Sequence, residues 1–272
     1  MAEARNDRDA AKSSAISAIV LAVFAVLVAA YSMTYGLQTL VWIEARSWLA
    51  SNPWLNDVPK PLPSPAATPA RPPELSGRAA QTKPSRLQAY DYDFSVPWTG
   101  KYQAGMTRLG AEFRFDSGQV VVFFDPESQL DTLRALKSAA PAEYAKYQSV
   151  FAHEDIETNY ALYRAVYGAS AAQVSPFMAE VEARRMNVLL LWKLSFGFDV
   201  PGGIYSFDFG KNRGFQFGSP ANGRPVAVRV FDDQDRQFRF IFTQTSGSNA
   251  PITQDDINSA IQSLRLTPIL ER

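Results

Sequence analysis

The sequence predicts an α+β protein with one N-terminal transmembrane helix, followed by a sandwich-like domain in which an antiparallel sheet packs with helices. Residues 15–41 contain no charged side chain, nine of the 18 prolines lie between Pro53 and Pro84, and blocks of period-2 and period-3.6 hydrophobicity follow. We therefore divide the chain into four parts. These are a cytoplasmic tail (1–13), a transmembrane helix (14–43), an interfacial segment with a proline-rich tether (44–85), and a soluble α+β domain (86–272).

The uncharged run is long enough to cross a bilayer, because about 20 helical residues span a hydrocarbon core. A cleaved signal peptide is the alternative, with Val28 and Ala30 as the small residues before the cleavage site. The apolar pattern continues through Ile43, which favours an uncleaved anchor. Tryptophan prefers the headgroup region, so we expect a membrane-interface position for three residues that follow: Trp42, Trp48 and Trp54.

The positive charges near the predicted span predict its orientation. Arg5, Arg8 and Lys12 precede the span, and Arg46 alone follows it closely. Basic residues concentrate on the cytoplasmic side of a membrane. We therefore predict a single-pass protein of the cell membrane, with a cytoplasmic N-terminus and an extracytoplasmic (periplasmic) C-terminal domain.

Small residues repeat along one face of the predicted span, at alternating spacings of three and four. Small residues let helix backbones approach closely in lipid. Besides the lipid bilayer, we therefore expect a membrane-protein partner or a second copy of the chain on this helix-packing seam; the alternative is an alanine-rich helix with no packing role. The seam consists of Ala15, Ala18, Ala22, Ala25, Ala29, Ser32, Gly36 and Thr39.

The proline-rich segment PKPLPSPAATPARPPE has no apolar periodicity. Such a chain is a semi-rigid spacer of about 3.1 Å per residue when extended. We expect it to hold the domain away from the membrane.

Period-2 patterns predict strands at 90–96, a hairpin of 111–115 and 119–124, and a four-stranded meander within 204–245. Period-3.6 patterns predict helices around 130–139 and through Tyr160, Tyr163 and Tyr167 to Gly168. Ser175–Pro176 is expected to open a helix that ends near Phe196 and is buried over 186–194. Thr253, with Asp256 three residues on, should cap a last helix.

The strand YDFSVPW, the late meander and the last helix ITQDDINSAIQSLRL resemble the PsbP-like domain family. That family includes an extrinsic photosystem subunit and a nuclear-import factor that binds a small GTPase. The resemblance covers about a third of the soluble domain. It implies an α/β/α-type sandwich and a role in binding or assembling other proteins, and it carries no functional residue over.

The residue inventory excludes several kinds of chemistry. Lys+Arg and Asp+Glu are equal at 27 each, so no global field attracts nucleic acid, and the absence of cysteine excludes thiolate chemistry. The one histidine, His153, lies in AHEDIE, which lacks the second histidine of HExxH; a polar helix start explains it better than a metal site. Asp232, Asp233 and Asp235 could bind calcium weakly, but a solvated turn is the simpler interpretation. We expect no catalytic residue, cofactor or metal site.

These observations predict a non-enzymatic accessory or assembly subunit of a larger membrane complex, acting by protein–protein interaction through its extracytoplasmic domain. The alternative is a tethered extracytoplasmic binding module for a small ligand or cell-envelope component, with a pocket between sheet and helices. A hydrolase that uses carboxylates is a third hypothesis, which would need two acids converging in a cleft.

The predicted orientation can be tested with alkaline phosphatase fused after Arg272. Because the basic residues precede the span, the fusion is expected to be active. A stably expressed but inactive fusion would reverse the predicted topology.

Overall fold

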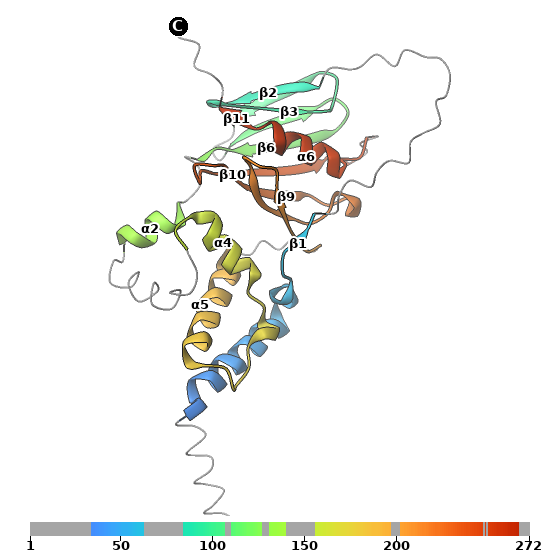
Figure 1. Ribbon diagram of the computed structural model, residues 1–272. Coiled ribbons are helices and arrows are strands. Elements are labelled where there is room, and N and C mark those ends of the chain that lie inside the picture. The colour runs from blue at the N-terminus through green and yellow to red at the C-terminus, as the bar shows by residue number, and fades with distance from the viewer. Residues whose placement is uncertain are drawn as a thin grey trace, which may run out of the picture.

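The computed structural model describes residues 34–62, 84–106, 110–126, 131–139, 156–196, 202–246, 248 and 250–266. Over these residues the chain is α+β, as predicted. A large sheet crosses the molecule, with a small sheet and a helix on one face and a group of helices on the other (Figure 1).

The large sheet has the order β1-β7-β8-β9-β10-β6-β5-β4, and every neighbouring pair is antiparallel except β1 with β7. The predicted meander (β7 to β10) and the predicted hairpin (β5 and β6) are confirmed. The parallel β1 makes the sheet mixed, not purely antiparallel as predicted. The strands are β1 (Lys60–Pro61), β4 (Tyr102–Met106), β5 (Ala111–Phe115), β6 (Gln119–Phe124), β7 (Ile204–Asp208), β8 (Arg213–Phe217), β9 (Val226–Phe231) and β10 (Gln237–Gln244).

A first hydrophobic core lies between this sheet and a second layer, made of β2 (Ser85–Ala89), β3 (Tyr92–Val96), β11 (Arg265–Leu266) and α6 (Gln254–Ser263). Phe94 is fully buried, and its ring centroid lies 5.9 Å from that of Phe113 and 5.1 Å from that of Phe240. The predicted capping box of α6 is confirmed, because the Thr253 hydroxyl accepts from the Asp256 N–H and the Asp256 carboxylate accepts from the Thr253 N–H.

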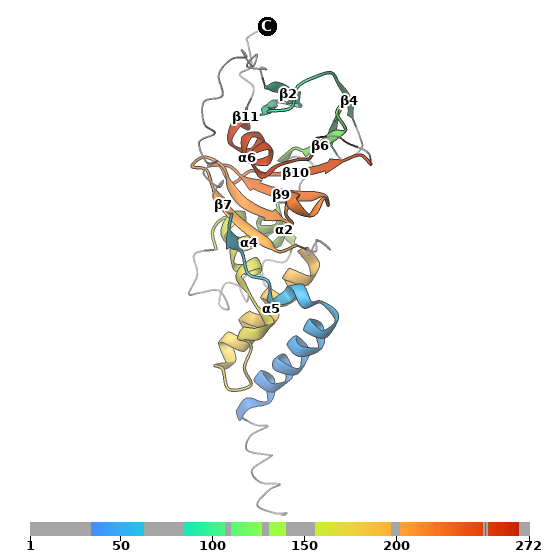
Figure 2. The same cartoon turned by 90° about the vertical axis from the view of Figure 1, so that its right-hand side faces the viewer.

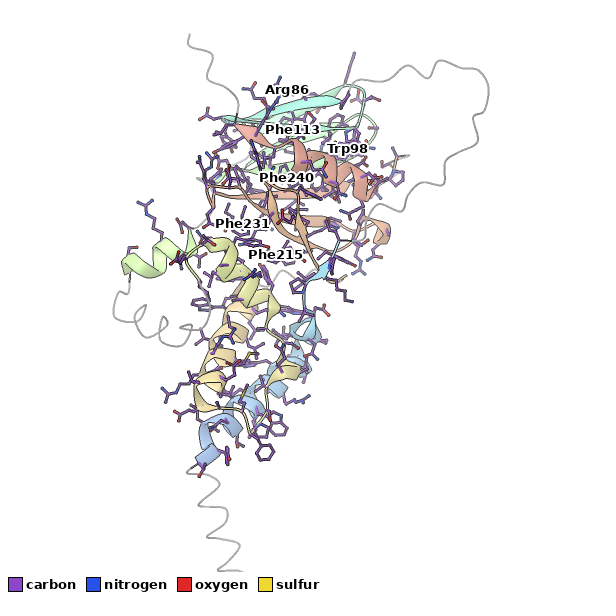
Figure 3. The ribbon with its side chains drawn as sticks, in the orientation of Figure 1. Arg86, Trp98, Phe113, Phe215, Phe231 and Phe240 are labelled. Carbon is purple, nitrogen blue, oxygen red and sulfur yellow. The ribbon has the colours of Figure 1, made fainter. Side chains whose placement is uncertain are left out.

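A second core lies on the opposite face, where the phenylalanines of β8 and β9 meet the helices. Phe215 and Phe231 lie on this side of the sheet, and Phe113 and Phe240 on the other (Figure 3). The helical layer contains a helix over residues 34–51, η1 (Pro53–Asn56), α2 (Thr132–Ala139), α4 (Asn159–Gly168), η3 (Ala171–Gln173) and α5 (Glu180–Phe196), while the short η4 (Pro220–Asn222) follows β8.

The start of α5 differs from the prediction. Ser175 does not cap the helix but closes a turn, in which its hydroxyl accepts from the Phe177 N–H and its carbonyl from the Met178 N–H. The helix begins at Glu180. Its C-terminal half is not buried all round either, because Leu191 is exposed, and a charged residue, Lys193, is fully buried there.

Residues 44–62, predicted as an interfacial segment and part of the tether, are built into the folded domain. Ala45 and Leu55 are fully buried in the second core, and the Leu62 N–H donates to the Ser206 carbonyl beside β1. The prolines here fit regular structure, since Pro53 opens η1 and Pro61 lies in an edge strand, where no N–H is required. Residues 34–62 therefore pack with the domain that was predicted to begin at residue 86, and the rest of the expected tether, 63–83, lies outside the described residues.

The predicted transmembrane helix falls largely outside the described residues. Its described part, 34–43, is helical. Among the helices that the structure describes, none combines the length and the hydropathy needed to cross a bilayer.

Leu55 offers a test of this revised boundary. Leu55→Ala is expected to lower the free energy of unfolding by about 2–5 kcal/mol, because it leaves a cavity in the second core. Val58→Ala, three residues on and 40 % exposed, should cost about 0.5 kcal/mol or less. Urea denaturation of the full chain in detergent, followed by near-ultraviolet circular dichroism, measures both. Equal stabilities would mean that this segment is not part of the folded unit.

Candidate interaction surface

The helix over residues 34–51, here called the stalk helix, lies beside α5 in both views of the molecule (Figures 1 and 2). One face, with Gln38, Val41 and Ala45, is buried against the domain. The opposite face carries Leu40 and Ile43, with Leu37 at its edge; all three are exposed, and we call them the apolar stripe.

The exposed face of the stalk helix changes character after the apolar stripe. Glu44, Arg46 and Ser47 are the next exposed positions, so the second half of the helix is amphipathic in the ordinary way. The first half presents large apolar side chains on both faces. Exposed groups of large apolar side chains mark surfaces that contact another protein or a membrane.

Gly36 lies on the same side of the stalk helix as Leu40 and Ile43, at helical spacings of four and seven. A Cβ built on it would meet no described atom within 4 Å. Of the predicted seam, Gly36 and Thr39 belong to the described residues, and Ala15, Ala18, Ala22, Ala25, Ala29 and Ser32 lie outside them. The spacing of the predicted seam thus leads on to Ile43 of the apolar stripe, while Leu37 lies off the seam.

The three tryptophans expected at the membrane interface are all half-buried. Trp42, Trp48 and Trp54 pack against the second core, and the Arg46 guanidinium lies 5.9 Å from the ring centroid of Trp42. Their contacts with the domain were not predicted from the sequence. Their membrane-interface position stays a prediction.

The stalk is joined to the domain by the ammonium of Lys193, which lies on α5 and is completely buried. It donates to the carbonyls of Asp57 and Ala169 at 2.6 Å each and to that of Tyr167 at 3.1 Å, with a longer contact of 3.4 Å to the Leu55 carbonyl. These carbonyls lie at the C-terminal ends of η1 and α4, where helix dipoles favour a cation. Burial lowers the pKa of Lys193 to about 8, opposed by the nearby Asp57 carboxylate.

Asn56 adds a second link at the same junction. Its side-chain oxygen accepts from the Ala172 N–H at 3.0 Å and from the Ser170 hydroxyl at 3.2 Å. The residues that follow the stalk helix therefore bind both α5 and the α4–α5 connection, and the position of the stalk is fixed by polar contacts on two sides.

The N-terminus of α4 is tied to the sheet by Asp235, from the turn between β9 and β10. Its carboxylate accepts from the Asn159 N–H at 2.5 Å and from the Tyr160 N–H at 3.0 Å. The Arg229 guanidinium of β9 lies 4.2 Å from the Tyr163 ring centroid. The interpretation of this turn as merely solvated is thus wrong for Asp235, and also for Asp232, which accepts from the Arg236 side chain at 2.7 Å.

Two adjoining cavities lie at the other side of the sheet, near the end of α6. Their volumes are about 240 and 460 Å³, and both are lined by Lys211, Asn212, Leu264 and Arg265. The lining mixes cationic and anionic side chains, including Asp93 and Asp233. Within the described part of the chain, no three His, Cys, Asp or Glu side chains are close enough to share a metal ion; His153 and Glu154 lie outside that part.

Lys193 makes stability depend on pH in a specific direction. Its pKa is lower in the folded chain than the ordinary value of 10.5, so the unfolded chain binds more protons between these values and stability rises with pH across that window. The free energy of unfolding should rise by about 2 kcal/mol between pH 7.5 and 9.5 from this group.

Lys193→Met is the matched variant. Its free energy of unfolding should not show this increase with pH. At pH 7.5 it should be about 2–4 kcal/mol lower than that of the wild type, because the substitution leaves buried carbonyls without a donor. Denaturant titrations of both proteins at the two pH values measure the difference. An identical pH slope in the two proteins would contradict a buried ammonium.

Comparisons with family models, with curated proteins and with solved structures give no match for this chain. The resemblance to the PsbP-like domain therefore stays a prediction.

Proposed function

We propose that the protein is a single-pass, membrane-anchored accessory or assembly subunit of a larger membrane complex, which acts without catalysis through an extracytoplasmic domain. The observation that supports this proposal best is the stalk helix. One of its faces belongs to the core of the domain, and the other carries the apolar stripe.

The attachment of the stalk distinguishes a positioned subunit from a loosely tethered one. A proline-rich tether of thirty residues would let a domain reach roughly 90 Å from the membrane. The stalk helix instead packs one face against the domain, and the hydrogen bonds of Lys193 and Asn56 fix the residues that follow its end. A domain attached in this way is held rigidly to the stalk helix, as an assembly subunit requires.

The apolar stripe fits a helical protein partner. Ser32, Gly36, Thr39 and Ile43 continue the alternating spacing of four and three, so the predicted seam passes from the proposed span into the described stalk. The open space beside Gly36 allows a second backbone to approach closely. A partner helix can therefore pack along the span and continue onto the stripe.

The alternative function, a tethered binding module, has support from a different feature. The two adjoining cavities beside Lys211 and Arg265 offer charged groups of both signs to a small polar ligand. They lie at the end of α6, not beneath α4 and α5, and the larger one is lined mainly by polar surface, unlike most ligand pockets. We therefore place this function second.

A pair of variants in the proposed span tests the assembly function. Ala25→Leu is expected to abolish or strongly reduce association, because a large side chain on the seam separates the helix backbones. Val23→Leu, which lies off the seam, should associate like the wild type. Both remain strongly hydrophobic, so their abundance in the membrane should be equal. Cross-linking in native membranes, followed by co-purification, measures association. If Ala25→Leu associates like the wild type, the seam has no packing role and the binding module becomes the better proposal.

A further inference from the structure

The turn before α5 exposes an aromatic ring at the end of the molecule where the stalk helix begins. Phe177 is 70 % exposed, more than any other large apolar side chain that the structure describes. Val181, one helical turn further along the chain, is 48 % exposed. Large apolar side chains as exposed as these mark surfaces that contact a membrane or another protein.

A ring contact fixes the height of Phe177 relative to the proposed span. Its ring centroid lies 6.0 Å from that of Tyr35, with an edge-on angle of 77°. Tyr35 lies in the first turn of the described helix. The uncharged run continues beyond Tyr35, but its first 21 residues, from Ala15 to Tyr35, already match the roughly 20 that cross a hydrocarbon core. Phe177 is therefore level with the point at which a span of that length would leave the hydrocarbon.

Charged side chains set a limit on how deep this end can lie. Glu180 pairs with Arg184, and Glu182 pairs with Arg185 at 3.1 Å, all on the first turns of α5. Charges are excluded from the hydrocarbon but tolerated among headgroups. The two pairs leave no net charge on this surface, so headgroups of either sign can lie against it. The hydrocarbon boundary must fall between the Phe177 ring and Glu180.

We propose that Tyr35, Phe177 and Val181 form a bilayer-docking tip, with the Phe177 ring in the boundary between headgroups and acyl chains. Aromatic rings favour this depth. The proposal rests on the membrane anchor of the proposed function and deepens it, because it gives the domain a second contact with the bilayer, contributed by a segment far from the anchor in sequence.

The docking tip also moves the predicted membrane boundary. The hydrocarbon ends near Tyr35, not at Ile43. At 1.5 Å per residue, Ile43 then stands about 12 Å outside it. Leu40 and Ile43 are consequently exposed to the aqueous phase, where a protein partner, not lipid, covers the apolar stripe.

The absence of native cysteine allows a direct measurement of depth in the full chain. Val181→Cys and Leu191→Cys place a fluorescent label on the same helix, at positions of similar exposure, 48 % and 44 %, and ten residues apart. Each protein is reconstituted at one copy per nanodisc. Quenching is measured with brominated lipid and with aqueous iodide.

We expect lipid quenching of the Val181 label to exceed that of the Leu191 label several-fold, and iodide quenching to show the reverse. Phe177→Ser in the Val181→Cys background should bring both values toward those of the Leu191 label, because the inserted ring is gone. Equal iodide quenching at both positions, in a protein that still resists carbonate extraction, would overturn the docking tip and leave the anchor intact.

Two other outcomes also contradict the proposal. A Val181 label protected from both quenchers would show that protein, not lipid, covers the tip. Extraction of the full chain from membranes by carbonate would remove the anchor, and with it both the docking tip and the proposed function.

Discussion

The ammonium of Lys193 determines where the helical layer holds the stalk. It is buried without a carboxylate ion pair in direct contact, and backbone carbonyls from two separate parts of the chain supply its acceptors. Burying an ammonium is costly, and only several acceptors in good geometry offset that cost. The two segments that carry these carbonyls are not paired with each other by backbone hydrogen bonds. The lysine ammonium holds them together instead, because it donates to carbonyls of both. Without it, the ends of η1 and α4 would face each other with acceptors only.

The large sheet connects the helical layer held by Lys193 to the rest of the molecule. Alternating side chains of β8 and β9 give one face to the helices and the other to the small sheet, so Phe215 and Val228 enter different cores. Asp235 then caps α4 from the turn between β9 and β10, and Lys193 carries the connection on to the residues after the stalk helix. Each link is short and directional, and a continuous path of fixed contacts runs from the sheet to the apolar stripe.

The sequence predicts those parts of this arrangement that depend on local periodicity. The hairpin of β5 and β6, the meander and the capped α6 follow from alternation, turn residues and a capping box, all of which act within a few residues. Lys193 could not be predicted, because within VLLLWKL it reads as a solvated charge and its acceptors lie up to 138 residues away. The role of Asp235 could not be predicted for the same reason. An aspartate in a solvated turn and one that accepts from a distant helix N-terminus have the same local sequence, and α4 lies about 75 residues away. The proline content of residues 53–61 led to the wrong prediction of a tether. Pro53 and Pro61 fit regular structure because they occupy positions that need no N–H.

The proposed roles of the docking tip and the apolar stripe depend on each other through this rigidity. If the docking tip rests on the bilayer and the stalk is fixed to the domain, the apolar stripe faces a partner in one orientation and at one distance from the membrane. Association then loses less orientational freedom than it would for a domain on a flexible tether, because much of that freedom is already removed in the free subunit. A large contact area is therefore not required of the stripe, and three exposed side chains with an open glycine beside them can suffice for a specific contact within the plane of the membrane. Lys193 would then contribute to the affinity for a partner indirectly, by fixing the stalk, without contacting that partner.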